Sequence, residues 1–156
     1  MNVFIDAFLQ EKSSKKLHLL GKTKDSLLSK YARSERIVFH GSVPHGEVKG
    51  YIARSKVCVN YIPDKFPFNI QTSTKLIEYA AYGDRFISTD YQWIKDFERQ
   101  TGFFCYKFKC DMTNFNIEEA LSEKFIKGNI EEYNWNKILE KSKILVSLEE
   151  LLNNDA

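Results

Sequence analysis

The sequence lacks long apolar runs, has few residues that break secondary structure, and carries almost no net charge. A membrane-spanning helix needs about 20 consecutive apolar residues, and no stretch of this 156-residue chain approaches that length. Seven glycines and three prolines are too few for a linker-rich or low-complexity protein. Lys and Arg total 23 against 21 Asp and Glu. The formal charge of +2 therefore argues against strong electrostatic attraction to nucleic acid or anionic lipid.

Cysteine is also scarce, and its spacing excludes a CxxC motif. Of Cys58, Cys105 and Cys110, the first lies in the apolar run KVCVNYI and is predicted to be a buried, reduced thiol. A disulfide between the other two stays open, although an intracellular chain is favoured. At the N-terminus the charges follow the apolar stretch, the reverse of a secretory signal. We therefore expect a cytoplasmic protein, with peripheral association at the inner face of a membrane left open.

The residues that are present predict one folded domain, covering residues 1–156. Hydrophobic residues make up 43% of the chain and aromatic residues 14%, which is enough to build a buried core. Short β-rich runs alternate with amphipathic stretches. Predicted strands cover residues 17–20, 36–41, 56–62, 85–89 and 103–108. Predicted helices cover residues 2–12, 25–32, 45–54 and 74–82, with two or three more after residue 117.

This alternation, with connections of a few residues, is typical of an α/β protein whose parallel sheet is covered on both faces. In such sheets ligands bind outside the carboxyl ends of the strands. The loops after Leu20, His40, Ile62 and Thr89 are therefore the expected location of a functional site.

The most informative segment is residues 71–90, where a loop rich in hydroxyl side chains leads into a helix. Ser73 or Thr74 is a suitable N-cap, and Gly83 follows the helix as its C-cap. Free N–H groups at a helix N-terminus can hold a phosphate, and Lys75 adds positive charge. Glu78 lies one turn further on and can accept hydrogen bonds from two vicinal hydroxyls. This chemistry suits a nucleoside diphosphate, although a simple helix cap with solvated Lys75 and Glu78 is the more frequent alternative.

The same segment resembles a known family. STKLIEYAAYGDRFIST is similar to the signature S-x-K-x-x-E-Y-x-A-x-G-x-P-V-I-x-T of group 1 glycosyltransferases, the retaining, glycogen-synthase-like family that includes many bacterial polysaccharide transferases. The run from LHLLG to VCVNYIP resembles the preceding strands and helices of that family, and YNWNKILEKS resembles its late tryptophan helix. The similarity spans residues 15–142, with the elements in the family's order.

The resemblance implies a Rossmann-like doubly wound parallel sheet, the C-terminal donor-binding half of a GT-B enzyme. It implies retaining transfer of a hexosyl group from a UDP- or GDP-linked sugar to a glycan or lipid-linked acceptor, in bacterial-type surface polysaccharide synthesis. The acceptor and any catalytic base belong to an N-terminal domain outside these residues, so little catalysis is expected from this chain alone. No cofactor or metal is expected beyond the nucleotide-sugar itself.

Seven positions match the family's donor site. Glu78 matches the glutamate that holds the donor ribose. Ser73, Thr74 and Lys75 match positions that contact the diphosphate. Gly21 matches a glycine that lets the donor approach the backbone closely, and Ser42 with Val43 match the loop that contacts the base. No catalytic residue is assigned. The three histidines, His18, His40 and His45, are scattered along the sequence, and none is interpreted as a zinc ligand.

The sequence departs from the family pattern in three places. Ile70 stands where many members have a first glutamate, eight positions before Glu78, and Asp84-Arg85 replaces a residue followed by proline. The family's first strand, and the loop that brings an Arg and a Lys to the diphosphate, precede the similarity. That strand would be central, so its loss would leave two strands with unpaired backbone groups. A fragment, a chain that depends on association and a rearranged sheet all stay open.

Four other features could have a function, but for each a structural explanation is at least as well supported. Tyr61, Phe66 and Phe68 could form a sugar or base platform, but local packing is favoured. Asp90 could contact a sugar hydroxyl, but we expect it to cap the next helical turn. The last apolar set could dock on an N-terminal domain or pack within this one; it comprises Leu148, Leu151 and Leu152. A basic patch could attract a lipid-linked acceptor or an anionic membrane, but a solvated face is favoured; it comprises Lys12, Lys15, Lys16, Lys22 and Lys24.

Two other function classes stay open. One is a non-catalytic, degenerate transferase half that acts as an interaction subunit, which Ile70 and the missing strand favour. The other is a different doubly wound enzyme, such as a nucleotide-sugar epimerase, but the sequence offers no catalytic acids for it. The sequence shows no arrangement of residues typical of a Ser-His-Asp or Cys-His nucleophile.

Overall fold

The computed structural model describes residues 2–144 as an α/β domain with short parallel strands. The strands are β1 (Leu17–Leu20), β2 (Ile37–Gly41), β3 (Cys58–Asn60), β4 (Phe86–Thr89) and β5 (Lys107–Phe108). The α-helices are α1 (Asn2–Gln10), α2 (Asp25–Tyr31), α3 (His45–Arg54), α4 (Thr74–Tyr82), α5 (Gln92–Thr101), α6 (Ile117–Ser122) and α7 (Trp135–Ser142). Two 3₁₀ turns, η1 (Phe68–Ile70) and η2 (Glu131–Tyr133), complete the described elements.

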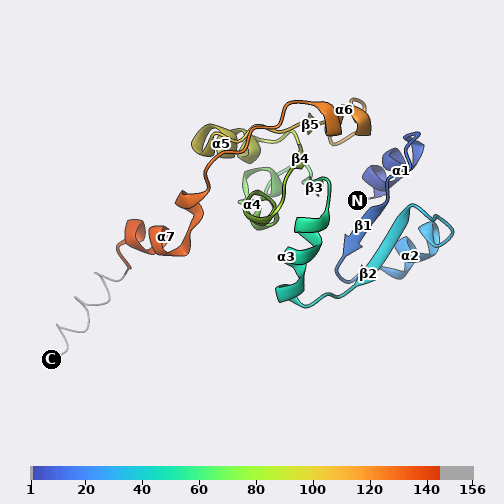
Figure 1. Ribbon diagram of the computed structural model, residues 1–156, viewed down its shortest axis with the longest axis horizontal. Helices are drawn as coiled ribbons and strands as arrows, with labels where there is room; N and C mark the ends of the chain where they lie inside the picture. Colours follow the sequence, from blue (N-terminus) through green and yellow to red (C-terminus); the bar gives the residue numbers. More distant parts are fainter. Residues whose placement is uncertain (1, 145–156) are drawn as a thin grey trace.

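The strands form two separate parallel sheets rather than the single doubly wound sheet that the sequence predicts. One sheet has the order β1-β2 and the other the order β3-β4-β5. In Figure 1 the strands follow one another as β5, β4, β3, β1 and β2, with an interruption between β3 and β1. The expectation that two strands carry unpaired edges is confirmed for β1 and β3. Within residues 2–144 no backbone hydrogen bond joins these two strands.

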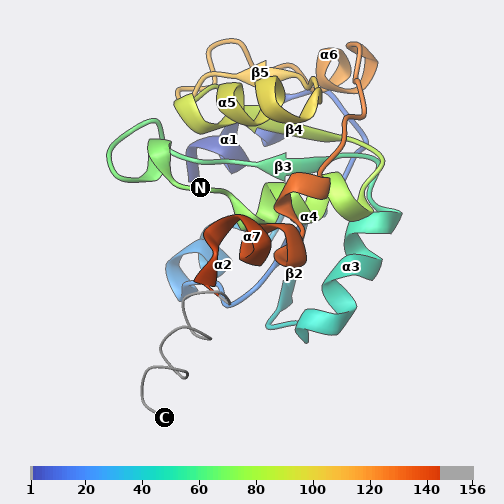
Figure 2. The same cartoon turned by 90° about the vertical axis from the view of Figure 1, so that its left-hand side faces the viewer.

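Helices cover both faces of the three-stranded sheet. Helices α4 and α5 lie on one face, and α1 lies on the other (Figure 1, Figure 2). Successive residues of β4 point to opposite faces, so Phe86 packs with the α4 and α5 side chains while Ile87 packs with those of α1. The α1 cluster also includes Ile37 of β2. This shared core layer holds the two sheets together across the interruption.

Local sequence signals explain the helices that flank the site. Helix α4 begins after Ser73, whose Oγ accepts a hydrogen bond from the N–H of Leu76, so the predicted N-cap is confirmed. Gly83 occupies the predicted C-cap position, with an ordinary negative φ of −94°. Its N–H donates to the carbonyl of Tyr79. Helix α3 has the predicted bounds, beginning at His45 after Pro44.

Several predicted elements differ from the structure. The predicted strand at 103–108 is shortened to β5, because Phe104 does not pair with β4. It forms an antiparallel bridge with Ile126 instead. Helix α5 was not predicted; it buries Ile94 and Phe97 and ends at Gly102, whose φ is 75°. The three cysteines are free thiols, with Cys58 buried as predicted. The apolar residues Leu148, Leu151 and Leu152 lie outside the described residues.

No helix within residues 2–144 has the length and apolar character needed to cross a bilayer.

Candidate functional site

A cavity of about 850 Å³ lies between the two sheets. It is bordered along its length by residues 17–21 of the β1 side and residues 56–59 of the β3 side. At the carboxyl ends of the strands, the cavity wall includes five of the seven residues predicted to bind a donor: Gly21, Ser42, Val43, Lys75 and Glu78. The fold therefore brings together positions that are up to 57 residues apart in the sequence.

Two glycines shape one wall of this cavity mouth. Gly21 and Gly41 end β1 and β2 with φ values of 110° and 67°, in the region that side chains with a Cβ rarely adopt. The N–H of Gly21 donates to the carbonyl oxygen of Gly41 at 2.7 Å. This bond holds the two turns side by side, and Ser42 and Val43 follow directly. No atom lies within 4 Å of the Cβ position of Gly21, so its surface is open.

The start of α4 is fixed by a buried polar network that sequence reasoning missed. Asn60 is fully buried at the end of β3, and its Oδ1 accepts a 2.9 Å hydrogen bond from the hydroxyl of Ser73. Its Nδ2 donates to Ser88 Oγ at 3.0 Å and to the Tyr91 hydroxyl at 3.1 Å. One amide therefore ties the N-cap of α4 to β3, to β4 and to the residue before α5. The available signal was an isolated polar residue in the otherwise apolar run KVCVNYI.

This network also decides which groups of the α4 N-terminus are available to a ligand. Ser73 is buried, does not line the cavity, and uses its hydroxyl for Leu76 and Asn60. Thr74 is exposed and also lies outside the cavity wall. Within the described chain, the backbone N–H groups of Thr74 and Lys75 have no hydrogen-bond acceptor. The helix end can therefore offer two amides to an anion, with Lys75 directed to the cavity.

The charged residues of the largely apolar cavity wall are basic apart from one carboxylate. Five of its residues are Lys or Arg, and Glu78 is its single acidic residue. The side chain of Glu78 is about one-third exposed, and its Oε1 lies 3.8 Å from His45 Nε2. Lys75 is exposed as a residue, but surrounding protein atoms displace water from its ammonium and lower its pKa. An anion in the cavity would compensate for that lost solvation.

Two histidines lie side by side in this wall, contrary to the interpretation that they are scattered. His18 of β1 and His40 of β2 are stacked, with His18 Nδ1 2.8 Å from His40 Nε2. Burial, reinforced by the neighbouring charges of His40 and Lys16, lowers the pKa of His18. His40 is the extra residue where the β1–β2 register shifts, between the pairs Leu19–Phe39 and Leu20–Gly41. This irregularity cannot be read from the sequence.

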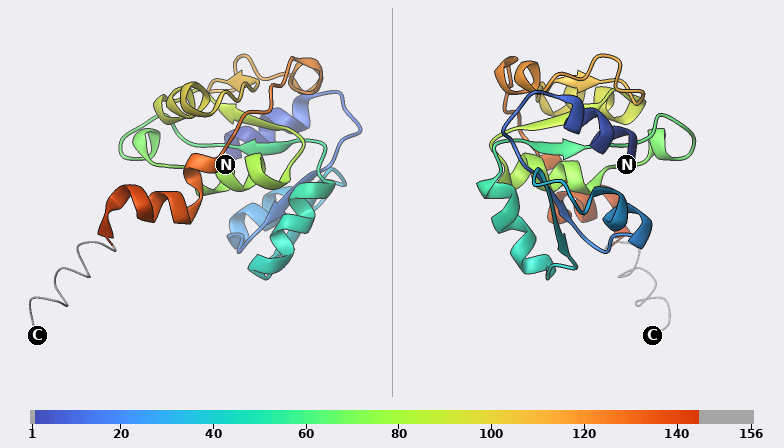
Figure 3. Two further views of the ribbon diagram at one scale, coloured as in Figure 1. Left: turned by 60° about the vertical axis from the view of Figure 1, so that its left-hand side comes forward. Right: turned by 90° about the vertical axis from the view of Figure 1, so that its right-hand side faces the viewer.

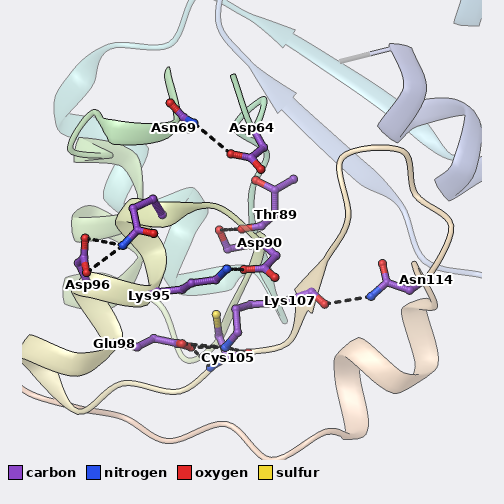
Figure 4. A network of polar contacts seen from close by, with 12 residues as sticks. Asp64, Asn69, Thr89, Asp90, Lys95, Asp96, Glu98, Cys105, Lys107 and Asn114 are labelled. Atoms are coloured by element: carbon purple, nitrogen blue, oxygen red, sulfur yellow. Dashed lines mark hydrogen bonds and ion pairs between the residues drawn. The ribbon is translucent and has the colours of Figure 1, made fainter. Parts of the chain in front are cut away.

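Other candidates from the sequence lie away from the cavity. Ile70 is 59% exposed at the end of η1, and Phe66 and Phe68 are also exposed and do not line it. Asp90 forms a 3.1 Å salt bridge to Lys95 (Figure 4), so it does not cap α5, which begins after Tyr91. Tyr61 does border the cavity.

No family model matches the chain, and neither a curated protein nor a solved structure matches it significantly. Within the described residues no three or more His, Cys, Asp and Glu side chains form a group suited to a metal ion. The metal-independent donor site therefore stays a prediction.

Proposed function

We propose that this domain binds a UDP- or GDP-linked sugar with its diphosphate at the N-terminus of α4 and its ribose hydroxyls on Glu78. The observation that carries the proposal is that Lys75 and Glu78, at the start of α4, both line the cavity at the carboxyl ends of parallel strands. A diphosphate needs positive groups and N–H donors, whereas ribose hydroxyls need an acceptor. Lys75 with two unpartnered amides supplies the first, and Glu78, one helical turn away, supplies the second.

The reaction we propose is retaining hexosyl transfer to a glycan or lipid-linked acceptor in bacterial-type surface polysaccharide synthesis. The motif STKLIEYAAYGDRFIST supports this proposal through its resemblance to group 1 glycosyltransferases. The acceptor site would come from an N-terminal domain, so this polypeptide alone would bind the donor but transfer little. Gly21 would permit close approach of the donor, and Ser42 and Val43 would contact the base through their backbone.

A non-catalytic interaction subunit is the second candidate, and the interrupted sheet favours it. The exposed Ile70, at the position of a family glutamate, points the same way because no carboxylate is available there for the transferred sugar. Sugar transfer on addition of a transferase N-terminal domain would decide for the enzyme. Donor binding without transfer under those conditions would decide for the subunit.

Nucleotide binding is tested by thermal unfolding of the full chain with UDP, GDP, ADP and inorganic pyrophosphate. A ligand at 100 times its Kd stabilises the folded state by about 2.7 kcal/mol, which raises the Tm by several degrees in a domain of this size. UDP or GDP should raise the Tm more than pyrophosphate, because the latter lacks ribose for Glu78. Equal shifts with pyrophosphate would reject the ribose role, and no shift with any nucleotide would reject the proposed function.

A further inference from the structure

We propose that a cluster of basic side chains from β1, β2 and α3 binds a phosphate group, at a site separate from the N-terminus of α4. In Figure 3, helix α3 (teal) lies beside β1 and β2 (blue), on the opposite side of the molecule from α5 and α6. The ligand is the dianionic group of inorganic phosphate or of a phosphate monoester. This site does not depend on the proposed nucleotide site. The histidine cluster, all of which lines the cavity, comprises Lys16, His18, His40, Tyr51 and Arg54.

The two imidazole rings are joined by one hydrogen bond. His18 Nδ1 lies 2.8 Å from His40 Nε2, across the parallel pairing of β1 with β2. One of these inner nitrogens donates and the other accepts. Each ring also has an outer nitrogen, His18 Nε2 or His40 Nδ1, and within residues 2–144 neither has a hydrogen-bond partner. The pair therefore keeps two unused polar atoms at the cavity wall.

Helix α3 adds an aromatic ring and a guanidinium to this pair. Tyr51 forms a T-shaped contact with His40, with 4.9 Å between the ring centroids. Arg54 follows three residues later on the same helix face, and its guanidinium carbon lies 5.2 Å from the centre of the Tyr51 ring. In the described part of the chain Arg54 forms no salt bridge. The cation–π contact therefore orients the guanidinium while its N–H donors stay available to an anion.

The cluster has positive charge but no carboxylate partner. Lys16 is exposed and forms no salt bridge within residues 2–144. Glu78, the single acidic residue of the cavity wall, lies beside His45 instead, with 3.8 Å between Oε1 and Nε2. Burial lowers the pKa of His18, and the charges of His40 and Lys16 lower it further. A dianion among these basic groups would oppose the repulsion that disfavours protonation.

Binding of a dianion and proton uptake by the histidine pair are therefore coupled. In the neutral pair one outer nitrogen carries a proton and the other does not, whereas one added proton makes both outer nitrogens donors. A bound dianion favours this charged form, and by reciprocity the charged form favours the dianion. The pKa of His18 should consequently rise when the site is occupied.

Histidine NMR of the full-length chain tests this coupling, because the ring signals report His18, His40 and His45 separately. Sulfate is the first probe, since it stays a dianion throughout the pH titration, and chloride at equal ionic strength is its control. Sulfate should raise the pKa of His18, whereas chloride should leave it unchanged. Equal rises with both salts would mean general screening of charge and would overturn the proposal.

Inorganic phosphate and methyl phosphate distinguish free phosphate from a phosphate ester. Both are mainly dianions at pH 7.5, and their Kd values are read from the His18 ring signal. Arg54→Gln should weaken binding by about ten-fold through the loss of charged donors. Arg33→Gln changes an exposed arginine outside the cavity and should leave the Kd within about two-fold. Binding of inorganic phosphate alone would assign free phosphate to the site, and binding of methyl phosphate as well would assign a phosphate ester.

The variant Lys75→Gln separates this site from the α4 N-terminus. It should weaken UDP binding but keep the Kd of phosphate at His18 within about two-fold. Loss of the His18 response in Lys75→Gln would mean a single anion site at α4, which would overturn the second site and leave the proposed function standing. Unchanged phosphate binding in Arg54→Gln, or no response of His18 in the unmodified protein, would also overturn the second site, whether or not UDP binds.

Discussion

Replacing Asn60 with alanine should destabilise the whole domain and loosen the α4 N-terminus. The side chain is fully buried and makes three hydrogen bonds, to Ser73, Ser88 and Tyr91. Each bond contributes about 1 kcal/mol net, and a buried partner left unsatisfied costs about 1–3 kcal/mol more. Allowing for partial relaxation, Asn60→Ala should lower the free energy of unfolding by about 3–5 kcal/mol.

The assay is urea unfolding followed by circular dichroism, with Asn136→Ala as the matched control. Asn136 is exposed on α7, so its replacement should change the free energy of unfolding by less than about 0.5 kcal/mol. Tyr91→Phe removes one bond of the network and should cost about 1 kcal/mol. In the Asn60→Ala background that cost should disappear, since the partner is already gone.

Two results would refute this reasoning. A loss below about 1 kcal/mol for Asn60→Ala would mean that the amide does not hold the network together. An unchanged Tyr91→Phe cost in both backgrounds would mean that the hydroxyl and the amide are not coupled.

Two further perturbations test the packing. At pH 8 the native protein should react with a disulfide reagent at one thiol, that of half-buried Cys110. The other two thiols should be unreactive because burial raises the pKa of Cys58 to about 11 and also raises that of Cys105. Rapid reaction of all three thiols before urea is added would contradict this burial. Gly128→Ala should cost at least about 1–3 kcal/mol, since an added Cβ would lie 2.2 Å from the Thr101 carbonyl oxygen and 2.4 Å from the Phe103 nitrogen. Gly46→Ala in α3, where no atom lies within 4 Å, should not destabilise in the same urea assay, and equal losses would contradict the packing at Gly128.

The elements around the site could be predicted because their signals are local. Ser73 caps α4 by accepting a hydrogen bond from the N–H of Leu76, three residues further along the chain. The bounds of β1, α3 and α4 follow from periodicity together with adjacent glycine, proline and serine residues. The division into two sheets was one of the alternatives that the sequence left open, because the family's central strand has no counterpart in the similarity.

Other features depend on contacts that periodicity does not encode. The apolar run FFCYKF reads as a strand, yet Phe103 and Cys105 are buried by packing rather than by a sheet ladder. Asn60 and the His18–His40 pair join residues 13 to 31 positions apart. Their partners are set by the pairing and register of the strands, so the sequence gives their identities but not their pairing.

We propose that Glu78 holds the ribose of a bound nucleotide. Calorimetry with UDP and 2′-deoxy-UDP should be run on the unmodified protein, on Glu78→Ala, and on Glu47→Ala as a control for an exposed glutamate on α3. Glu78→Ala should weaken UDP binding by about 1–3 kcal/mol through lost charged hydrogen bonds and should abolish the preference for UDP over its deoxy analogue, while Glu47→Ala retains both. Unchanged UDP affinity in Glu78→Ala, or a preference for the ribose hydroxyl that persists without that carboxylate, would contradict the account.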